Sequence, residues 1–164
     1  MVIIIMGVCG SGKSTIGEKL SEIMNFRFME GDSFHSETNI KKMSMGEPLT
    51  EKEREPWLKS IRKEIDRNLE QRIQCVITCS ALSRKSRGIL GTNRAEIKLI
   101  YLYAFQSILM NRMAKRKNHF MPADLLRSQF EVLEEPELSE ALHVRVDMPA
   151  QEVTDFIIQE LKKF

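Results

Sequence analysis

Short apolar runs alternate along the chain with segments whose apolar residues recur at helical spacing. Three runs, 2–6, 75–79 and 97–103, are continuous and rich in β-branched residues, as strands buried on both faces of a parallel sheet are. Runs at 26–29 and 144–146 give a weaker strand pattern. Strands that alternate with helices imply βαβ crossovers, so the pattern predicts the α/β class, with a parallel sheet covered on both faces.

Four amphipathic helices are expected between and after these strands. Two stretches, 33–56 and 112–136, interrupt the alternation and contain prolines and many charges. Excursions of this kind are either binding segments and lids or solvated surface helices. The four helical faces are formed by Ile16, Leu20, Ile23 and Met24; by Trp57, Leu58, Ile61, Ile65 and Leu69; by Ile108, Leu109 and Met113; and by Val153, Phe156, Ile157 and Leu161.

Composition narrows the class of protein. The 164 residues correspond to about one domain, and 42% apolar with 29% charged residues is typical of a soluble globular chain. Lys and Arg number 25 against 23 Asp and Glu, a net charge of +2, which argues against nucleic acid as a partner. The longest apolar run, 1–9, is too short to cross a membrane and lacks the basic start of a signal peptide. Three cysteines do not indicate a disulfide scaffold, so we expect a cytoplasmic protein.

Residues 7–14 match the phosphate-loop pattern G-x-x-x-x-G-K-[ST], with an apolar run before them and a helical pattern after them. Glycines allow successive backbone N–H groups to point into one concavity, and the helix that follows adds its positive end. Lys13 is expected to reach the β- and γ-phosphates, and the Ser14 hydroxyl to ligate Mg²⁺. The predicted nucleotide contacts are Gly7, Val8, Cys9, Gly10, Ser11, Gly12, Lys13, Ser14 and Thr15.

The phosphate loop alone predicts binding of ATP or GTP. The chain has no N-K-x-D signal for guanine, and only 144–147 gives a weak apolar run that ends in Asp. A small domain with a basic, lid-like segment resembles the nucleoside-monophosphate-kinase type of P-loop enzyme.

Asp32 follows the second apolar run, where the ends of parallel strands face the ligand crevice. We expect it to lie beside the phosphate loop if the second strand neighbours the first. A carboxylate there is able to orient a hydroxyl for phosphoryl transfer and accept its proton. The alternative is that Asp32 is the N-cap of the next helix.

Polar residues downstream form a candidate acceptor site. His35, Asn39 and Lys42 fall at i, i+4 and i+7, and on a helix they share one face. That face suits a polyol or sugar acid, or is simply solvated. Arg54 is either a bidentate clamp for a carboxylate or a surface arginine. Trp57 is predicted to lie in the core or to form a hydrophobic staple, with stacking on a sugar as the alternative.

The phosphate loop and the acceptor-side residues together resemble the sequence pattern of the small P-loop gluconokinases of the shikimate-kinase-like group. The resemblance extends from residue 2 to about residue 147. It is carried by Gly31-Asp32-Ser33-Phe34-His35, Asn39, Lys42-Met43, 46–50, 54–58, Cys79-Ser80-Ala81-Leu82, 119–122, Leu125-Leu126, Ser128-Gln129-Phe130 and 133–136.

The resemblance implies transfer of the γ-phosphoryl group of ATP to the 6-hydroxyl of D-gluconate, with Mg²⁺. It also implies an adenylate-kinase-like sheet of order 2-3-1-4-5 in one domain, 1–164, and commonly a homodimer. An acceptor segment is expected at about 33–57 and a lid at about 112–122. By position, Lys13, Asp32 and the lid residue Arg116 are the catalytic residues, and Arg112 is a second lid arginine aimed at the phosphates. The acceptor-side contacts implied are His35, Lys42, Arg54 and Arg87.

The chain departs from the family pattern at several positions. Ser83 and Ser86 stand where the family has Lys and Tyr, and Arg84 and Lys85 are close enough to substitute for them. Glu51 and Glu53 replace Asp residues, and Asn118 replaces Gly. The Ser83 and Ser86 departures motivate one alternative hypothesis, a kinase for shikimate or another sugar acid. A second alternative, from a different class, is a non-catalytic nucleotide sensor, against which the complete phosphate loop and Asp32 argue.

Overall fold

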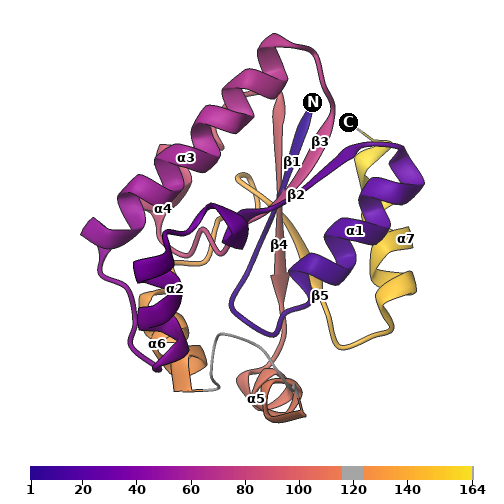
Figure 1. Ribbon diagram of the computed structural model, residues 1–164. Helices are drawn as coiled ribbons and strands as arrows, with labels where there is room; N and C mark the ends of the chain where they lie inside the picture. The colour runs from indigo at the N-terminus through magenta and orange to yellow at the C-terminus, as the bar shows by residue number, and fades with distance from the viewer. Residues whose placement is uncertain (116–123, 164) are drawn as a thin grey trace.

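The structure is a computed structural model that describes residues 1–115 and 124–163 (Figure 1). Strands and helices alternate as the apolar pattern predicts. In chain order the elements are β1 (Val2–Met6), α1 (Lys13–Met24), β2 (Arg27–Glu30), the 3₁₀ helix η1 (Gly31–Phe34), α2 (Glu37–Ser44), α3 (Glu51–Glu70), β3 (Cys75–Thr78), α4 (Arg84–Leu90), β4 (Ile97–Tyr103), α5 (Gln106–Lys115), α6 (Asp124–Val132), β5 (Leu142–Arg145) and α7 (Ala150–Leu161).

The five strands form one parallel sheet in the order β2-β3-β1-β4-β5, which confirms the predicted α/β fold and strand order. The central strand β1 pairs Val2 with Cys75 of β3 and with Ile97 of β4. The condition set for Asp32, that the second strand neighbours the first, is not met, because β3 lies between β2 and β1.

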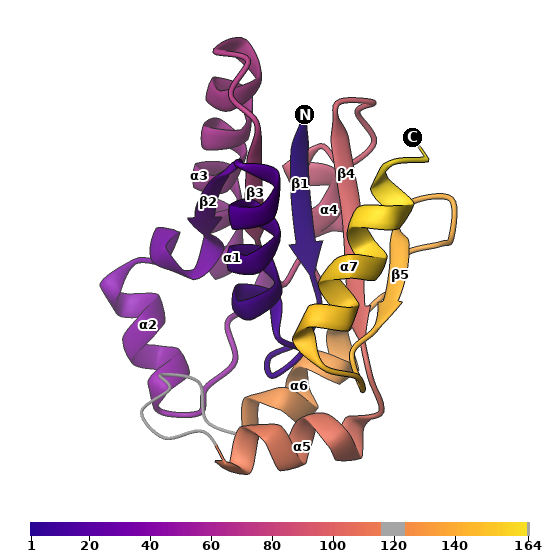
Figure 2. The same cartoon turned by 90° about the vertical axis from the view of Figure 1, so that its right-hand side faces the viewer.

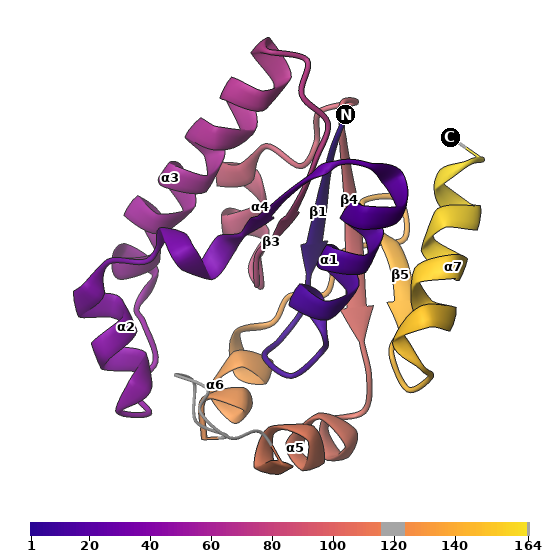
Figure 3. The ribbon, with the colours of Figure 1, turned by 45° about the vertical axis from the view of Figure 1, so that its right-hand side comes forward.

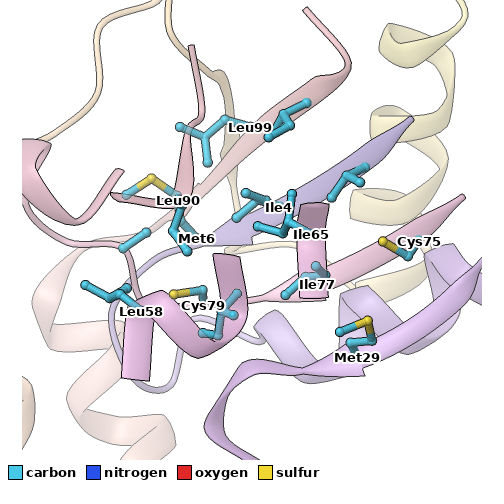
Figure 4. Packing of buried hydrophobic residues seen from close by; sticks show 14 of the residues in the cluster. Ile4, Met6, Met29, Leu58, Ile65, Cys75, Ile77, Cys79, Leu90 and Leu99 are labelled. Atoms are coloured by element: carbon cyan, nitrogen blue, oxygen red, sulfur yellow. The ribbon is translucent and has the colours of Figure 1, made fainter. Parts of the chain in front are cut away.

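Helices cover the sheet on both faces, as Figures 1 and 2 show. Side chains of β1 alternate between the two: Val2, Ile4 and Met6 pack with residues of α3 and α4, whereas Ile3 and Ile5 pack with α1 and α7. Figure 4 shows the first of these clusters, in which Ile65 and Leu58 of α3 pack together with strand residues such as Ile4 and Ile77 and with Cys79. All five residues of β1 are completely buried, which explains its continuous apolar sequence.

A third apolar cluster lies at the carboxyl ends of the strands. It joins the phosphate loop to α2, α5 and α6, through Val8, Met43, Leu109 and Leu126 among others. Figure 3 shows these three helices gathered at the end of the sheet where the loop between β1 and α1 lies. This cluster holds the site-forming segments on the rigid sheet. Within the described part of the chain, no helix is long and apolar enough to cross a membrane.

Candidate functional site

The phosphate loop connects the buried β1 to α1, which begins at Lys13 and has Gly12 as its N-cap. Gly7 is required for close packing, because a Cβ there would lie 2.5 Å from the carbonyl oxygen of Leu102. The Lys13 amine folds back over the loop and donates to the carbonyl oxygen of Val8 at 3.0 Å. The loop thus has the strand-to-helix geometry of an anion site.

A pocket of about 370 Å³ lies between the phosphate loop, α5 and the segment that joins β5 to α7. That volume is within the range of roughly 300–1,000 Å³ for small-molecule sites. Its walls include Gly12, Thr15, Arg112, Lys115, Val146 and Met148. Arg112 was predicted to aim at phosphates from a lid. It lines this pocket and donates a hydrogen bond to the carbonyl oxygen of Val146. The other lid arginine, Arg116, and most of the lid segment lie outside the described residues.

A second, narrower pocket lies on the opposite side of the phosphate loop, at the end of β2 and β3. Three of the predicted acceptor-side residues line it, namely Asp32, His35 and Arg54. The remaining walls come from Met43, Pro48, Leu49, Trp57, Ser80, Leu82, Leu125, Ser128 and Gln129. Residues from five separate segments therefore converge where the sequence predicts an acceptor.

Asp32 is half-buried in η1, and the alternative that it caps the next helix is wrong. Ser36 caps α2, and its hydroxyl accepts a hydrogen bond from the backbone N–H of Asn39 at 3.1 Å. Burial, with a smaller contribution from the Asp32 charge, raises the pKa of the Cys79 thiol to about 12, and the Lys13 charge opposes this shift. The carboxylate and the amine therefore both lie near the end of β3.

His35 and Trp57 form the base of this acceptor pocket. Their rings stack with centroids 4.1 Å apart, and the indole N–H of Trp57 donates to the Gly31 carbonyl at 2.8 Å. Burial, with a smaller effect of Arg54, lowers the pKa of His35 to about 4, so the ring is neutral at pH 7. Its Nδ1 is buried without a hydrogen-bond partner in the described structure. His35 therefore presents a neutral ring, suited to a hydroxyl rather than to a carboxylate.

Arg54 supplies the positive charge of the pocket. Burial lowers the pKa of its guanidinium, and the nearby carboxylates of Glu51 and Glu53 raise it. A partly desolvated cation gains from an anionic ligand, so Arg54 is placed to bind a carboxylate.

Asn39 and Lys42 do not line the pocket among the described contacts. The Lys42 amine binds both carboxylate oxygens of Glu53, at 2.9 and 3.0 Å. The Asn39 amide donates to the Glu53 carbonyl oxygen at 3.1 Å. The shared face of α2 was expected to meet the acceptor, and instead it fastens α2 to the first turn of α3.

Arg87 also has a setting that differs from the expected acceptor contact. It is 2% exposed and is directed into the protein, where its Nη1 donates to the carbonyl oxygens of Ala81, Leu82 and Glu134. A guanidinium in this position ties the loop after β3 to the segment after α6. It supports the pocket wall from behind.

Two of the departures from the family pattern, Ser83 and Ser86, belong to the start of α4, whereas Asn118 lies outside the described residues. Ser83 is the N-cap of α4, and the Ser83 hydroxyl accepts from the Ser86 backbone N–H at 3.1 Å. Arg84 and Lys85 do not substitute in the pocket, since both are exposed and pair with Glu137 and Glu51. Both substitutions thus lie outside the walls of the acceptor pocket.

Sequence reasoning assigned no role to Ser80, Ser128 or Gln129, which all line the acceptor pocket. Ser80 directly follows β3. The rule that polar residues at the ends of parallel strands face the ligand crevice would have identified it. Gln129 lies on α6, which has no strand-end signal, and its position depends on tertiary packing.

The donors available to Mg²⁺ are few. In residues 1–115 and 124–163, no three His, Cys, Asp or Glu side chains form a group able to hold a metal. Ser14, in the first turn of α1, is half-buried beside the phosphate loop. A single protein hydroxyl is compatible with Mg²⁺, because substrate phosphates and water supply most of its ligands in sites of this kind.

A larger pocket, of about 590 Å³, lies at the amino end of β4. Its walls include Arg94, Leu138 and His143, and none of the predicted site residues. The chemistry expected from the sequence is therefore concentrated at the other end of the sheet.

A family model, a curated relative and two solved structures that match this chain are all described as kinases. The shikimate kinase family model matches residues 9–162. A probable gluconokinase of Mus musculus is 36% identical, over 98% of this chain and 97% of the relative. The structure of a sugar kinase from Janibacter sp. HTCC2649 superposes with a TM-score of 0.92 at 35% identity, covering 98% of this chain and 94% of that one. A gluconokinase from Sinorhizobium meliloti 1021 has a TM-score of 0.87 at 38% identity, covering 99% and 91%.

Proposed function

Because the chain belongs to the gluconokinase family of ATP-dependent phosphotransferases, we propose that it transfers the γ-phosphoryl group of ATP to the 6-hydroxyl of D-gluconate. The observation that carries the proposal is the acceptor pocket beside the phosphate loop. It combines a carboxylate, a neutral imidazole and a guanidinium, from Asp32, His35 and Arg54. A linear polyhydroxy acid with one carboxylate offers a matching partner for each of these groups.

The reaction follows from these positions. ATP places its phosphates on residues 7–14, and Lys13 leaves the Val8 carbonyl to contact the β- and γ-phosphates. Asp32 orients the acceptor hydroxyl and takes its proton as the oxygen bonds to the γ-phosphorus. The bond from that phosphorus to the β–γ bridging oxygen breaks, and ADP leaves with the electron pair. The Ser14 hydroxyl would help to hold Mg²⁺ beside the phosphates, where the ion would supply further charge stabilisation.

Arg112 lines the pocket on the nucleotide side and holds the segment after β5 through Val146. We assign it to binding the nucleotide rather than to the transferred phosphoryl group. Arg116 keeps its predicted role at the phosphates, by analogy with the family and its spacing from Arg112.

The acceptor pocket must widen to admit its substrate. Its free volume is about 30 Å³, which holds one or two water molecules rather than a six-carbon acid. One wall, at Met43, belongs to α2, which lies outside the sheet, so outward movement of α2 opens the pocket. Closure around the bound acid then excludes water and limits ATP hydrolysis.

Shikimate is the alternative acceptor, motivated by the shikimate kinase family model and by Ser83 and Ser86. Ser83 caps α4 and Ser86 lies within that helix, and neither lines the pocket, so they give no reason to prefer shikimate. Identity of 36% to a probable gluconokinase over nearly the whole chain supports gluconate.

An acceptor panel tests the proposal. Purified protein with MgATP is assayed for ADP release with gluconate, shikimate and other sugar acids, and ³¹P NMR locates the phosphate on the product. We expect gluconate to give the highest kcat/KM, with a phosphate monoester on its terminal carbon. A preference for shikimate would assign the chain to the other kinase class, and acceptor-independent ADP release would indicate no acceptor site at all.

A further inference from the structure

One peptide unit of the phosphate loop is held from both sides. The Val8 carbonyl oxygen accepts from the Lys13 amine at 3.0 Å and from the Ser11 backbone N–H at 3.3 Å. The N–H of the same peptide, on Cys9, donates to Oε1 of Gln129 at 2.6 Å. The carbonyl and the N–H of a trans peptide point in opposite directions within one rigid plane. Lys13 and Gln129 therefore hold opposite edges of the Val8–Cys9 peptide.

The orientation of the Gln129 amide follows from its partner. A backbone N–H only donates, so the atom that faces Cys9 must be the carbonyl oxygen of the side chain. Gln129 also lines the acceptor pocket, together with Asp32 and Arg54. Its side chain thus contacts the phosphate loop and forms part of the wall that the acceptor meets.

Packing fixes the helix that carries Gln129. Leu125 and Leu126 of α6 are buried in the apolar cluster that contains Val8 and Cys9. Beyond the carboxyl end of α6, the Glu134 N–H donates to the Leu82 carbonyl oxygen at 2.9 Å. Figure 3 shows α6 next to the loop between β1 and α1. The amide is consequently presented to the loop from a helix anchored at both ends.

We infer that Gln129 is a positioning residue that couples the acceptor pocket to the catalytic lysine through the Val8–Cys9 peptide. The inference rests on the proposed function, in which Lys13 leaves the Val8 carbonyl when ATP binds. Gln129 then still holds the plane through the Cys9 N–H, and an acid in the pocket contacts the wall to which Gln129 belongs. Occupancy of the acceptor pocket is in this way transmitted to the phosphate loop.

The first test is structural and needs no substrate. Gln129→Met keeps the length of the side chain but removes the acceptor oxygen, whereas Gln129→Glu keeps an acceptor at the same place. Amide hydrogen exchange, followed by ¹⁵N NMR on the ligand-free protein, is expected to accelerate at Cys9 by about tenfold or more in Gln129→Met and to stay slow in Gln129→Glu. Unchanged exchange at Cys9 in Gln129→Met would overturn the inference.

The second test is kinetic. Gln129→Met is expected to lower kcat by about 10²-fold, the size of effect expected from a small misplacement of catalytic groups. The Kd of MgATP without acceptor and the thermal midpoint of unfolding are expected to stay near wild type. Gln151→Met, on the exposed face of α7, is the matched control and is expected to behave as wild type. A wild-type kcat in Gln129→Met would contradict the coupling.

The two proposals fail in different ways. Wild-type protein that phosphorylates gluconate, combined with a fully active Gln129→Met, leaves the proposed function intact and refutes the coupling. If wild-type protein prefers another acid of the panel, gluconate is not the acceptor, and the coupling is then tested with that acid. If no acid reacts, both proposals are wrong.

Discussion

The titration of His35, in the acceptor pocket, makes the stability of the folded protein depend on pH. The pKa of this histidine is about 4 in the folded protein and 6.5 in the unfolded chain, because burial opposes the charged form. Between these values the unfolded chain binds a proton that the folded protein does not. The free energy of unfolding therefore falls as the pH drops from 6.5 towards 4, and His35 has no such effect above pH 6.5.

Replacing this histidine tests the linkage. His35→Phe keeps an aromatic ring against Trp57 but does not titrate, so its stability is expected to fall less than that of wild type between pH 7.5 and pH 5. Urea unfolding at both pH values measures the difference, and the interval from pH 7.5 to 8.5 is the internal control. Equal losses in the two proteins would show that His35 is not held neutral.

Asp32 was assigned to the acceptor side by the strand-end rule, and His35 and Arg54 by the resemblance. All three line the pocket, and their roles in the reaction stay predictions. Lys42 and Arg87 were assigned by position to the acceptor, yet they bind Glu53 and backbone carbonyl groups. A long cation binds whichever acceptor tertiary packing brings closest, and sequence spacing does not contain that information.

At the scale of elements, the junction of β2 with η1 depends on the contact of Gly31 with β3. A Cβ on Gly31 would lie 1.9 Å from the carbonyl oxygen of Thr78, so the two strands would have to separate. Gly31→Ala is expected to destabilise the protein by about 3 kcal/mol or more.

Gly88 is the matched control, since a Cβ there meets nothing within 4 Å and the residue lies inside α4. Gly88→Ala is expected to stabilise by about 0.5–1 kcal/mol, because alanine favours the helix. Thermal or urea unfolding shows whether each variant is less or more stable than wild type. A Gly31→Ala variant as stable as wild type would show that β2 does not pack this closely on β3.

The first turn of α3 holds the acceptor segment. The Thr50 hydroxyl accepts from the Glu53 N–H at 3.3 Å, and the Glu53 carboxylate accepts from the Thr50 N–H at 2.7 Å. These bonds and Lys42 lower the pKa of Glu53 to about 2. The ionised Glu53 carboxylate therefore stabilises the folded protein fully above pH 4.5, the ordinary pKa of a glutamate. This stabilisation is lost as the pH falls towards 2.

Removing this cap tests its contribution. Thr50→Ala is expected to cost about 0.5–2 kcal/mol in urea unfolding at pH 7 and to raise the KM for the acceptor, because α2 is fastened to the same turn. Thr38→Ala, at an exposed position of α2, is expected to be close to neutral. Equal stability of both variants would exclude the capping role.

Elements with a strong apolar pattern were predicted best. The bounds of β1 and β4 agree with the apolar runs, and β2 and β5 are shifted by one or two residues because edge strands are only partly buried. No prediction was made for α4, and α6 lies in the stretch 112–136, where surface helices were only one of two readings; the two helices have seven and nine residues. Helices this short have little periodicity and are stabilised mainly by their tertiary contacts.

At the scale of the whole molecule, parallel strands bring separate segments to one edge. The phosphate loop, η1, α2 and α6 meet there because β1, β2 and β3 all end there. Strand order was implied by the resemblance rather than by periodicity, since apolar runs do not reveal which strands pair. The homodimer and the cytoplasmic location stay predictions, to be tested by light scattering and by fractionation.

The proposed reaction depends most on Asp32, which lines the acceptor pocket, and the turnover of Asp32→Asn with gluconate and MgATP is the direct measurement. We expect kcat to fall by about 10²-fold or more while the Kd of MgATP stays within about twofold of wild type. Asp155→Asn, on the exposed face of α7, is expected to retain full activity. Near-normal turnover of gluconate by Asp32→Asn would contradict the account.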